Sequence, residues 1–157
     1  GVGTARSRLA ACRYGGHDTS IFGFGRVSGD GYTAITNLVS SSGVVASDTS
    51  GVGGIRDNTA ACEFGGDKGI FGFGNDDAKV GETNLVSNVG VVATDTSAVG
   101  TARSSAASTQ YGGDKAIFGY GSGLTAVTNL VSNVGVVATD TTGVGTARDK
   151  LAACSFN

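Results

Sequence analysis

Three cysteines carry the side chains best suited to covalent or metal chemistry in this sequence, and they occupy one repeated position. Cys12, Cys62 and Cys154 each stand six residues after an arginine of a recurring segment, and Thr109 takes that position in another copy. None forms a C-x-x-C pair, and equivalent positions in different repeats are expected to lie apart. Threonine in place of cysteine is typical of a small buried side chain. We therefore interpret the thiols as structural and predict no metal site.

Catalytic chemistry has few candidates. His17 is the only histidine, and it stands beside Asp18 in a turn that carries one extra residue. A Ser-His-Asp or Cys-His site could form only there, and the nucleophile motif G-x-S-x-G is absent. The phosphate-binding patterns G-x-x-x-x-G-K-[ST] and G-x-G-x-x-G are also absent. We therefore predict that the protein is not an enzyme, with no catalytic residue and no cofactor.

Arginine and aspartate recur at fixed positions of the repeated segments. The members of the two sets are Arg6, Arg56, Arg103, Arg148, Asp48, Asp95 and Asp140. They could form an axial ring of charges that binds an anion or a sugar. Alternatively, each arginine pairs with an aspartate or with backbone carbonyls and holds a junction between repeats, because its planar fork bonds bidentately. Recurrence in every copy favours this second, structural role.

A ligand site is most expected in the segments that differ in length from one unit to the next, because their residues are not fixed by the repeat. They span residues 26–35, 75–82 and 122–127. Variable length confined to one point of a repeat indicates a loop on one face, which is often the binding face. Asp76 and Asp77 could contact a cation, but the EF-hand spacing D-x-[DN]-x-[DN]-G is missing. The candidate ligand-binding residues are Arg26, Asp30, Tyr32, Asp76, Asp77 and Lys79.

The chain is built from three full repeats and the beginning of a fourth. The segment TNLVSNVGVVATDT at residues 83–96 is repeated without change at residues 128–141, and GVGTAR at residues 1–6 recurs at residues 143–148. We take the units as residues 1–50, 51–97, 98–142 and 143–157. The last range holds only the first strand of a fourth unit, which could close a ring or exchange with a partner chain.

Each unit reads as four short strands, which in the first unit cover residues 7–14, 20–25, 34–40 and 44–49. The runs are rich in β-branched and aromatic residues and are bounded by Gly, Asn, Asp and Ser. Helical periodicity is absent. Units of about 45 residues with four strands are typical of propeller blades. The predicted fold is all-β and β-propeller-like, with three four-stranded antiparallel blades plus one extra strand.

The order of features within each unit resembles kelch-type β-propeller repeats. An arginine opens a strand of small apolar residues, a turn and the segment Ile-Phe-Gly-Phe-Gly follow, and then come a variable loop and a hairpin. The pattern spans all three units. It departs from the kelch pattern because the paired glycines are separated by one residue and the outer-strand tryptophan is absent. The resemblance implies a propeller of stacked blades.

Composition excludes several classes of protein. The 157 residues include 28 Gly and no Pro, and 39% are hydrophobic with a net charge of -2. A collagen helix needs Gly at every third position and proline, and a disordered chain would be more charged and less hydrophobic. No run approaches the roughly 18 apolar residues of a membrane-spanning helix. The near-neutral balance argues against a nucleic-acid partner.

Three blades do not close a propeller, since natural examples have about four to eight. We therefore predict that the chain associates with itself, either as a homodimer that closes a six-bladed ring or as part of a longer array. The leading functional hypothesis is a structural or interaction protein, with an extracellular or virion-like assembly favoured. The alternative is a carbohydrate-binding propeller with one shallow site per blade. Its aromatic residues would be Tyr14, Phe64, Tyr111 and Phe156, and its amides Asn37, Asn84 and Asn129.

Overall fold

The computed structural model describes residues 2–16, 18–29 and 31–155, and within these ranges it contains strands and turns but no helix. His17, Asp30 and Phe156, which the sequence singled out, lie outside the described residues. The strands are β1 (Arg6–Ser7), β2 (Ala10–Tyr14), β3 (Thr19–Gly23), β4 (Arg26–Val27), β5 (Thr36–Val39), β6 (Ala60–Phe64), β7 (Lys68–Asn75), β8 (Lys79–Val86), β9 (Ala107–Tyr111), β10 (Lys115–Gly119) and β11 (Thr128–Val131).

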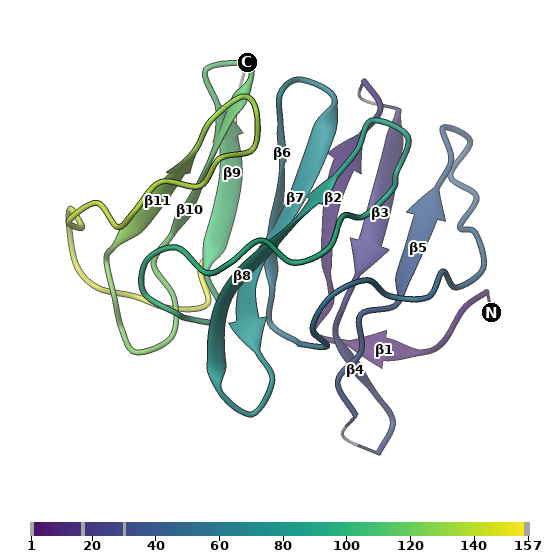
Figure 1. The fold of residues 1–157 in the computed structure, drawn as a ribbon, viewed down its shortest axis with the longest axis horizontal. Coiled ribbons are helices and arrows are strands. Elements are labelled where there is room, and N and C mark those ends of the chain that lie inside the picture. The colour runs from purple at the N-terminus through teal and green to yellow at the C-terminus, as the bar shows by residue number, and fades with distance from the viewer. Residues whose placement is uncertain (1, 17, 30, 156–157) are drawn as a thin grey trace.

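Three small antiparallel sheets make up the molecule, which confirms the all-β prediction. Their strand orders are β2-β3-β5, β6-β7-β8 and β9-β10-β11, so the second strand of each sheet is central. One sheet falls in each of the ranges 1–50, 51–97 and 98–142, which we call units one, two and three. Figure 1 shows the three sheets side by side, with the sheet of unit two between the others. A further two-stranded sheet, β1-β4, was not predicted.

The predicted fourth strand of each unit is wrong. In unit one, residues 44–49, which we call the returning segment, meet β5 only at two isolated bridges, Val39 with Val45 and Thr36 with Thr49. The returning segment has one residue more between these bridges than β5 has, so the ladder is interrupted as at a β-bulge. The extra residue lets Asp48 turn toward Asn37, to which it is hydrogen-bonded at 2.9 Å. Each sheet therefore has three strands.

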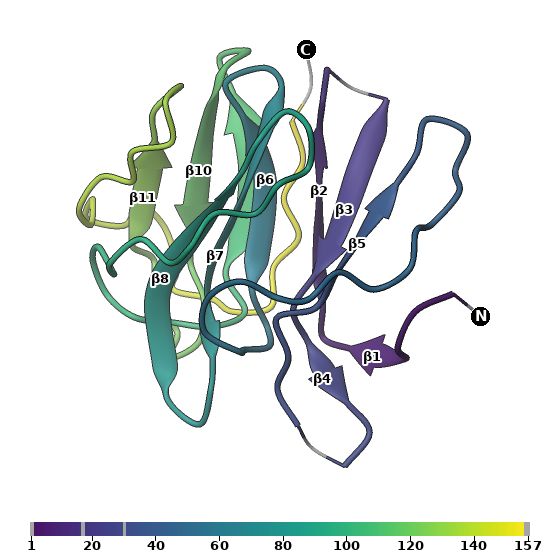
Figure 2. The same ribbon diagram turned by 45° about the vertical axis from the view of Figure 1, so that its right-hand side comes forward.

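The predicted extra strand at residues 143–157 is also wrong for its described part. Residues 143–155 contain no strand. The equivalent strands β2, β6 and β9 each pair with the central strand of their own unit, whereas residues 149–155 pair with no strand among the described residues. Figure 2 shows this yellow segment beside the inner strands, and Ala153 to Ser155 line the same cavity as residues of β2, β6 and β9.

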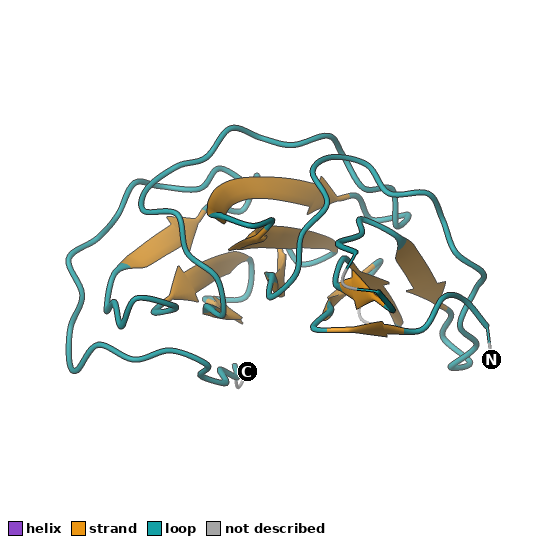
Figure 3. Cartoon of the chain, turned by 90° about the horizontal axis from the view of Figure 1, so that it is seen from below, coloured by secondary structure: helices purple, strands orange, loops and turns teal. Residues whose placement is uncertain are grey.

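The units follow one another along an arc that is open on one side (Figure 3). A ladder of backbone hydrogen bonds joins their beginnings. Asn58 N–H donates to Arg8 C=O at 3.1 Å, Ser105 to Asn58 at 3.0 Å and Lys150 to Ser105 at 3.3 Å. All four residues have positive φ, between 49° and 56°. The beginning of the fourth repeat therefore continues the order of the other three.

The hydrophobic core lies between the sheets. One cluster, which includes Ile21, Phe24 and Phe71, joins units one and two. A second cluster, which includes Phe73 and Phe118, joins units two and three. Since burying apolar area is the main stabilising contribution to folding, the stacking of neighbouring units holds the molecule together. The sheet of unit two is covered by a neighbouring sheet on both faces. The sheets of units one and three are each covered by a neighbouring sheet on one face only.

Candidate functional site

A buried arginine marks each junction between two full units. Arg103 is 0% exposed, and its guanidinium lies 3.9 Å from the centroid of the Phe73 ring of unit two. Its nitrogens donate to acceptors of unit three, namely Tyr120 C=O at 2.7 Å and Asn129 Oδ1 at 2.6 Å. The preceding unit thus supplies a ring and the following unit supplies the acceptors. A buried guanidinium needs the acceptors, because an unpaired buried charge is costly, and the ring adds a cation–π attraction.

The junction between units one and two repeats this arrangement. Arg56 is 2% exposed, stacks 4.2 Å above the ring of Phe24, and donates to Phe73 C=O at 3.0 Å and to Asn84 Oδ1. Burial lowers the pKa of both arginines, and the neighbouring Asp95 or Asp140 opposes that shift. Arg56 contacts Asp95 directly at 3.5 Å. Of the two arrangements expected from the sequence, backbone carbonyls are the closer partners of Arg56 and the aspartate lies farther away, while the amide acceptor was not expected.

The repeated aspartates hold the segment that leads to each arginine. Asp140 accepts hydrogen bonds from Thr101 N–H at 2.9 Å and from Asn129 Nδ2 at 2.9 Å, which orients the amide toward Arg103. Asp48 has the same partners in unit one, and the hydrogen bonds from Thr4 and Asn37 lower the pKa of its carboxyl group. Each of these carboxylates thus links the segment before an arginine to the asparagine that accepts from that arginine.

The first and last arginines of the series each have half of this site. Arg6 donates to Phe24 C=O at 3.3 Å, to Ile35 C=O and to Asn37 Oδ1, but no described ring lies beneath it. Arg148 lies 4.8 Å from the centroid of the Tyr120 ring, but its guanidinium has no hydrogen-bond acceptor among the described residues. Arg148 is also exposed, unlike Arg56 and Arg103.

Aromatic rings and glycines complete each junction. Phe71 meets Phe24 at a centroid distance of 5.1 Å, and Phe118 meets Phe73 at 5.2 Å, both edge-to-face. Phe71 also lies against Gly23, where an added Cβ would come within 2.7 Å of its ring. The glycines of the Phe-Gly-Phe-Gly segment therefore allow the neighbouring sheet to approach closely. Phe73 has a φ of 59°, and a register shift at Gly72/Gly74 marks a bulge there.

Two faces of the molecule carry residues equivalent to those of the internal junctions but have no neighbouring full unit against them. On unit one, Phe22 is 36% exposed, whereas its counterparts Phe71 and Phe118 are 0% exposed. It lies in a hollow of about 240 Å³ with Val2, Thr4, Arg6, Leu9, Asn37 and Val45, which we call the leading face. On unit three, a second hollow of about 240 Å³, the trailing face, includes Ile117, Gly119, Tyr120, Thr128, Arg148 and Leu151.

The trailing face exposes residues whose counterparts are covered inside the chain. Tyr111 is 38% exposed, against 7% for Tyr14 and 1% for Phe64. Ile117 is half-buried, whereas Ile21 and Ile70 are fully buried. This face therefore has the residue types of a packed interface. The described residues of 143–155 cover it only in part.

The variable loops of units one and two form a single cluster. Asp57 is fully buried and receives Arg26 Nε at 2.9 Å and Arg8 Nη1 at 3.2 Å. The Arg26 guanidinium lies 4.3 Å from the centroid of the Tyr32 ring, and the Tyr32 hydroxyl donates to Asp77 at 3.2 Å. The structure thus brings the candidates Arg26, Tyr32 and Asp77 together. Their contacts are with one another, which is how a loop is held in place.

The other loop candidates are outside this cluster. Asp76 and Lys79 are exposed, and Asp30 lies outside the described residues. Sequence reasoning missed Asp57, the residue that joins the two loops. The signal was weak, because Asp57 directly follows a repeated arginine at a position where units one and three have Ser7 and Ser104 but the fourth copy has Asp149.

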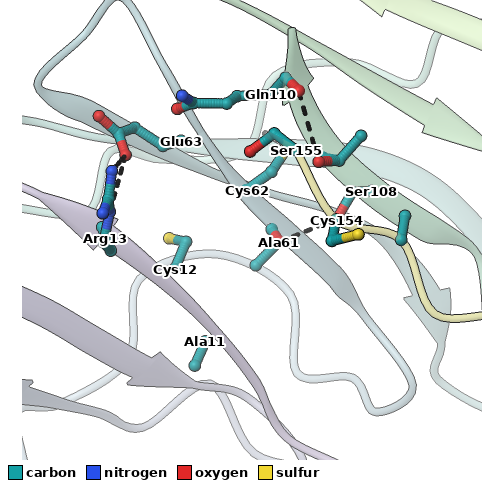
Figure 4. Close-up of a pocket in the computed structure, with 12 residues that line it drawn as sticks. Ala11, Cys12, Arg13, Ala61, Cys62, Glu63, Ser108, Gln110, Cys154 and Ser155 are labelled. Carbon is teal, nitrogen blue, oxygen red and sulfur yellow. Dashed lines mark hydrogen bonds and ion pairs between the residues drawn. The ribbon is translucent and has the colours of Figure 1, made fainter. Parts of the chain in front are cut away.

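The three cysteines line one cavity of about 440 Å³ at the axis of the arc, so the expectation that they lie apart is wrong (Figure 4). Inner strands converge there, and equivalent residues of successive strands come close. Burial raises the pKa of the Cys62 thiol to about 12, and burial together with Cys62 raises that of Cys12 further. Arg13 and Glu63 form an ion pair of 2.9 Å on the cavity wall. All three cysteines are free thiols.

No family model matches the chain, and no curated protein matches it in sequence. Among residues 2–16, 18–29 and 31–155, no group of three or more His, Cys, Asp or Glu side chains is placed to hold a metal ion. The described residues also include no helix that is long and apolar enough to cross a membrane.

Proposed function

We propose that this chain is a non-enzymatic structural or interaction protein that associates with itself through stacked units. One observation carries the proposal. The leading and trailing faces are the two halves of an interface that already forms twice within the chain, between units one and two and between units two and three. Each half exposes apolar and aromatic side chains that are buried at the internal junctions. Exposed apolar surface of this kind marks sites of association.

The arrangement we propose is a ring of six propeller-like units made from two chains. The three units of one chain form an arc that is open on one side (Figure 3). Two copies related by a two-fold axis would each present a leading face to the trailing face of the other, so that both open halves are used. The kelch-type order of sequence features supports units of this kind.

Light scattering coupled to size exclusion tests the proposal. The mass should rise with concentration from the 15.4 kDa of one chain to twice that value. Phe22→Ala should shift this transition to higher concentration, because Phe22 is the main aromatic side chain of the leading face. Val89→Ala is the control, since Val89 is 70% exposed at the rim of the middle unit. A strict monomer at every accessible concentration would contradict the proposed function.

Carbohydrate binding, the alternative function, loses most of the residues on which it depended. Tyr14 and Phe64 are buried at the junctions between units. Asn37, Asn84 and Asn129 are buried too, and each is bonded to an arginine and an aspartate. Their aromatic faces and amides are therefore not presented to solvent. Binding on a glycan array would restore this hypothesis.

A further inference from the structure

We propose that unit one of a second copy docks on the trailing face and displaces residues 143–155 from it, with Arg6 of that copy taking the place of Arg148 above Tyr120. The segment 143–155 would then be a built-in competitor of association. This inference rests on the proposed self-association and specifies its geometry. Four observations support it.

The first observation is that residues 1–6 have the same sequence as residues 143–148, which lie against unit three. Residues 1–6 and residues 143–148 have the identical sequence GVGTAR, and Leu-Ala-Ala-Cys follows two residues later in both cases. In the structure, residues 143–148 lead to Tyr120 of unit three. An identical segment from another copy can therefore make the same backbone contacts there.

The second observation is the complementarity of the two half-sites. Arg6 has carbonyl and amide acceptors in unit one but lacks a ring, and Arg148 has the Tyr120 ring but lacks acceptors. If unit one of a second copy docks with its acceptors in place, Arg6 comes to lie over Tyr120. The complete site seen at Arg56 and Arg103 is then restored.

The third observation concerns Phe22 and Gly119. Phe71 packs against Gly23 and Phe24, and Phe118 packs against Gly72 and Phe73. By the same register, Phe22 of a second copy would pack against Gly119 and Tyr120. Gly119 is buried in the single chain, but no aromatic ring packs on it as on Gly23 and Gly72: a Cβ added there would meet only Thr128 Cγ2, at 3.3 Å.

The fourth observation is that few contacts hold the segment 143–155. Arg148 C=O accepts from Gly121 N–H at 3.1 Å, Arg148 N–H donates to Thr125 C=O at 3.4 Å, and Lys150 N–H donates to Ser105 C=O at 3.3 Å. One side-chain hydrogen bond adds to these, from the Tyr120 hydroxyl to Val144 C=O at 3.2 Å. The described part of the segment has no strand pairing, and many of its residues are exposed. A folded unit would replace these bonds and add the apolar contacts of a whole sheet.

The main experiment is Arg148→Ala in the full chain, with the dimer dissociation constant measured by sedimentation velocity. Docking of an intact unit one predicts tighter association, by about two- to fivefold, because the competitor loses one exposed cation–π contact. Exchange of residues 143–155 into unit one of the partner predicts the opposite, since Arg148 would then donate to the acceptors around Asn37. Weaker or unchanged association would overturn the inference.

Gly119→Ala provides an independent test with the same readout. The added methyl group fits the single chain but would collide with Phe22 of the docked copy, so association should weaken by roughly tenfold. Circular dichroism checks that the variant folds, and Val89→Ala again serves as the control. Unchanged association of Gly119→Ala would place the interface elsewhere and contradict the proposed geometry.

The two proposals fail in different ways. If the wild type and Arg148→Ala are both monomeric at every concentration, the proposed function fails, and the inference fails with it. If the wild type forms a dimer that Arg148→Ala does not strengthen, only the displacement of residues 143–155 is contradicted.

Discussion

At the scale of single residues, the repeated arginines show how far a sequence pattern reaches. Their recurrence predicted a structural role, and in the structure Arg56 and Arg103 are buried and hydrogen-bonded at junctions between units. The ring that each covers was not predicted, because it belongs to the preceding unit and a linear pattern does not show which units touch. Backbone carbonyls were among the partners expected within a unit, but the asparagine amides that accept from Arg56 and Arg103 were not.

Replacing Arg103 by alanine should destabilise the chain by roughly 3 kcal/mol, as does the loss of one partner from a buried charged network. The substitution leaves Tyr120 C=O and Asn129 Oδ1 buried without their donor. Arg148→Ala, at the exposed equivalent position, should change the free energy of unfolding by less than about 0.5 kcal/mol. Urea unfolding of both variants provides the comparison. Similar losses for both would show that the acceptors of Arg103 contribute little.

The cysteines should differ in reactivity despite sharing one cavity. Thiolate is the reacting form, and burial keeps Cys12 and Cys62 protonated at pH 8, since the Cys62 pKa is raised to about 12. Cys154 is exposed. Iodoacetamide at pH 8 should therefore modify Cys154 alone in the native chain and all three cysteines in urea, as read by mass spectrometry. Rapid modification of Cys12 in native protein would argue that the cavity opens.

At the scale of elements, the first three strands of each unit could be predicted and the fourth could not. Runs of β-branched and aromatic residues identified β2, β3 and β5 within about three residues of their observed ends. The returning segment has the same composition, but one extra residue interrupts its pairing between Thr36 and Val39. Amino-acid composition indicates which segments adopt an extended conformation. Whether two such segments form a continuous ladder depends on their having equal numbers of residues between paired positions, which the composition of a single sequence does not show.

The stacking of sheets should respond differently to one methyl group at two equivalent glycines. In Gly72→Ala, the new Cβ would lie 2.9 Å from the Phe118 ring, which should cost about 1–3 kcal/mol through overpacking. Gly119→Ala should be nearly neutral in the monomer, since its Cβ meets only Thr128. Thermal unfolding at low protein concentration measures both. Equal stability of the two variants would mean that the sheets can separate slightly without loss.

At the scale of the whole molecule, three of the six predicted ligand residues are held in the cluster around Asp57, whereas Asp76 and Lys79 are exposed. Arg26, Tyr32 and Asp77 contact one another, and the open faces lie at the two ends of the arc. The repeat pattern indicated three full units, which within these 157 residues leaves one face of the first unit and one face of the third without a neighbouring full unit. It could not identify which side chains they expose, since this depends on the alternation of inward and outward residues in each strand.

Unit two should be the most protected part of the chain in hydrogen exchange. In a stack of repeats, each unit is stabilised by its neighbours, and unit two has a full sheet on both faces. Amides of β6 and β7 should therefore exchange more slowly than those of β3 and β10 at low protein concentration. Mass spectrometry of peptic fragments resolves these strands. Uniform protection across the three sheets would instead indicate a single cooperative unit.

The ladder that joins Arg8, Asn58, Ser105 and Lys150 gives the molecule a direction. At every step the N–H group belongs to the later unit and the carbonyl to the earlier one. The ladder therefore leaves a backbone N–H group at its first residue, Arg8, and a backbone carbonyl at its last, Lys150. Two chains that joined through their first units would place one N–H group against another. Any assembly that continues this ladder must run in one rotational sense, and the curvature of a single chain then decides whether it closes or continues as a spiral.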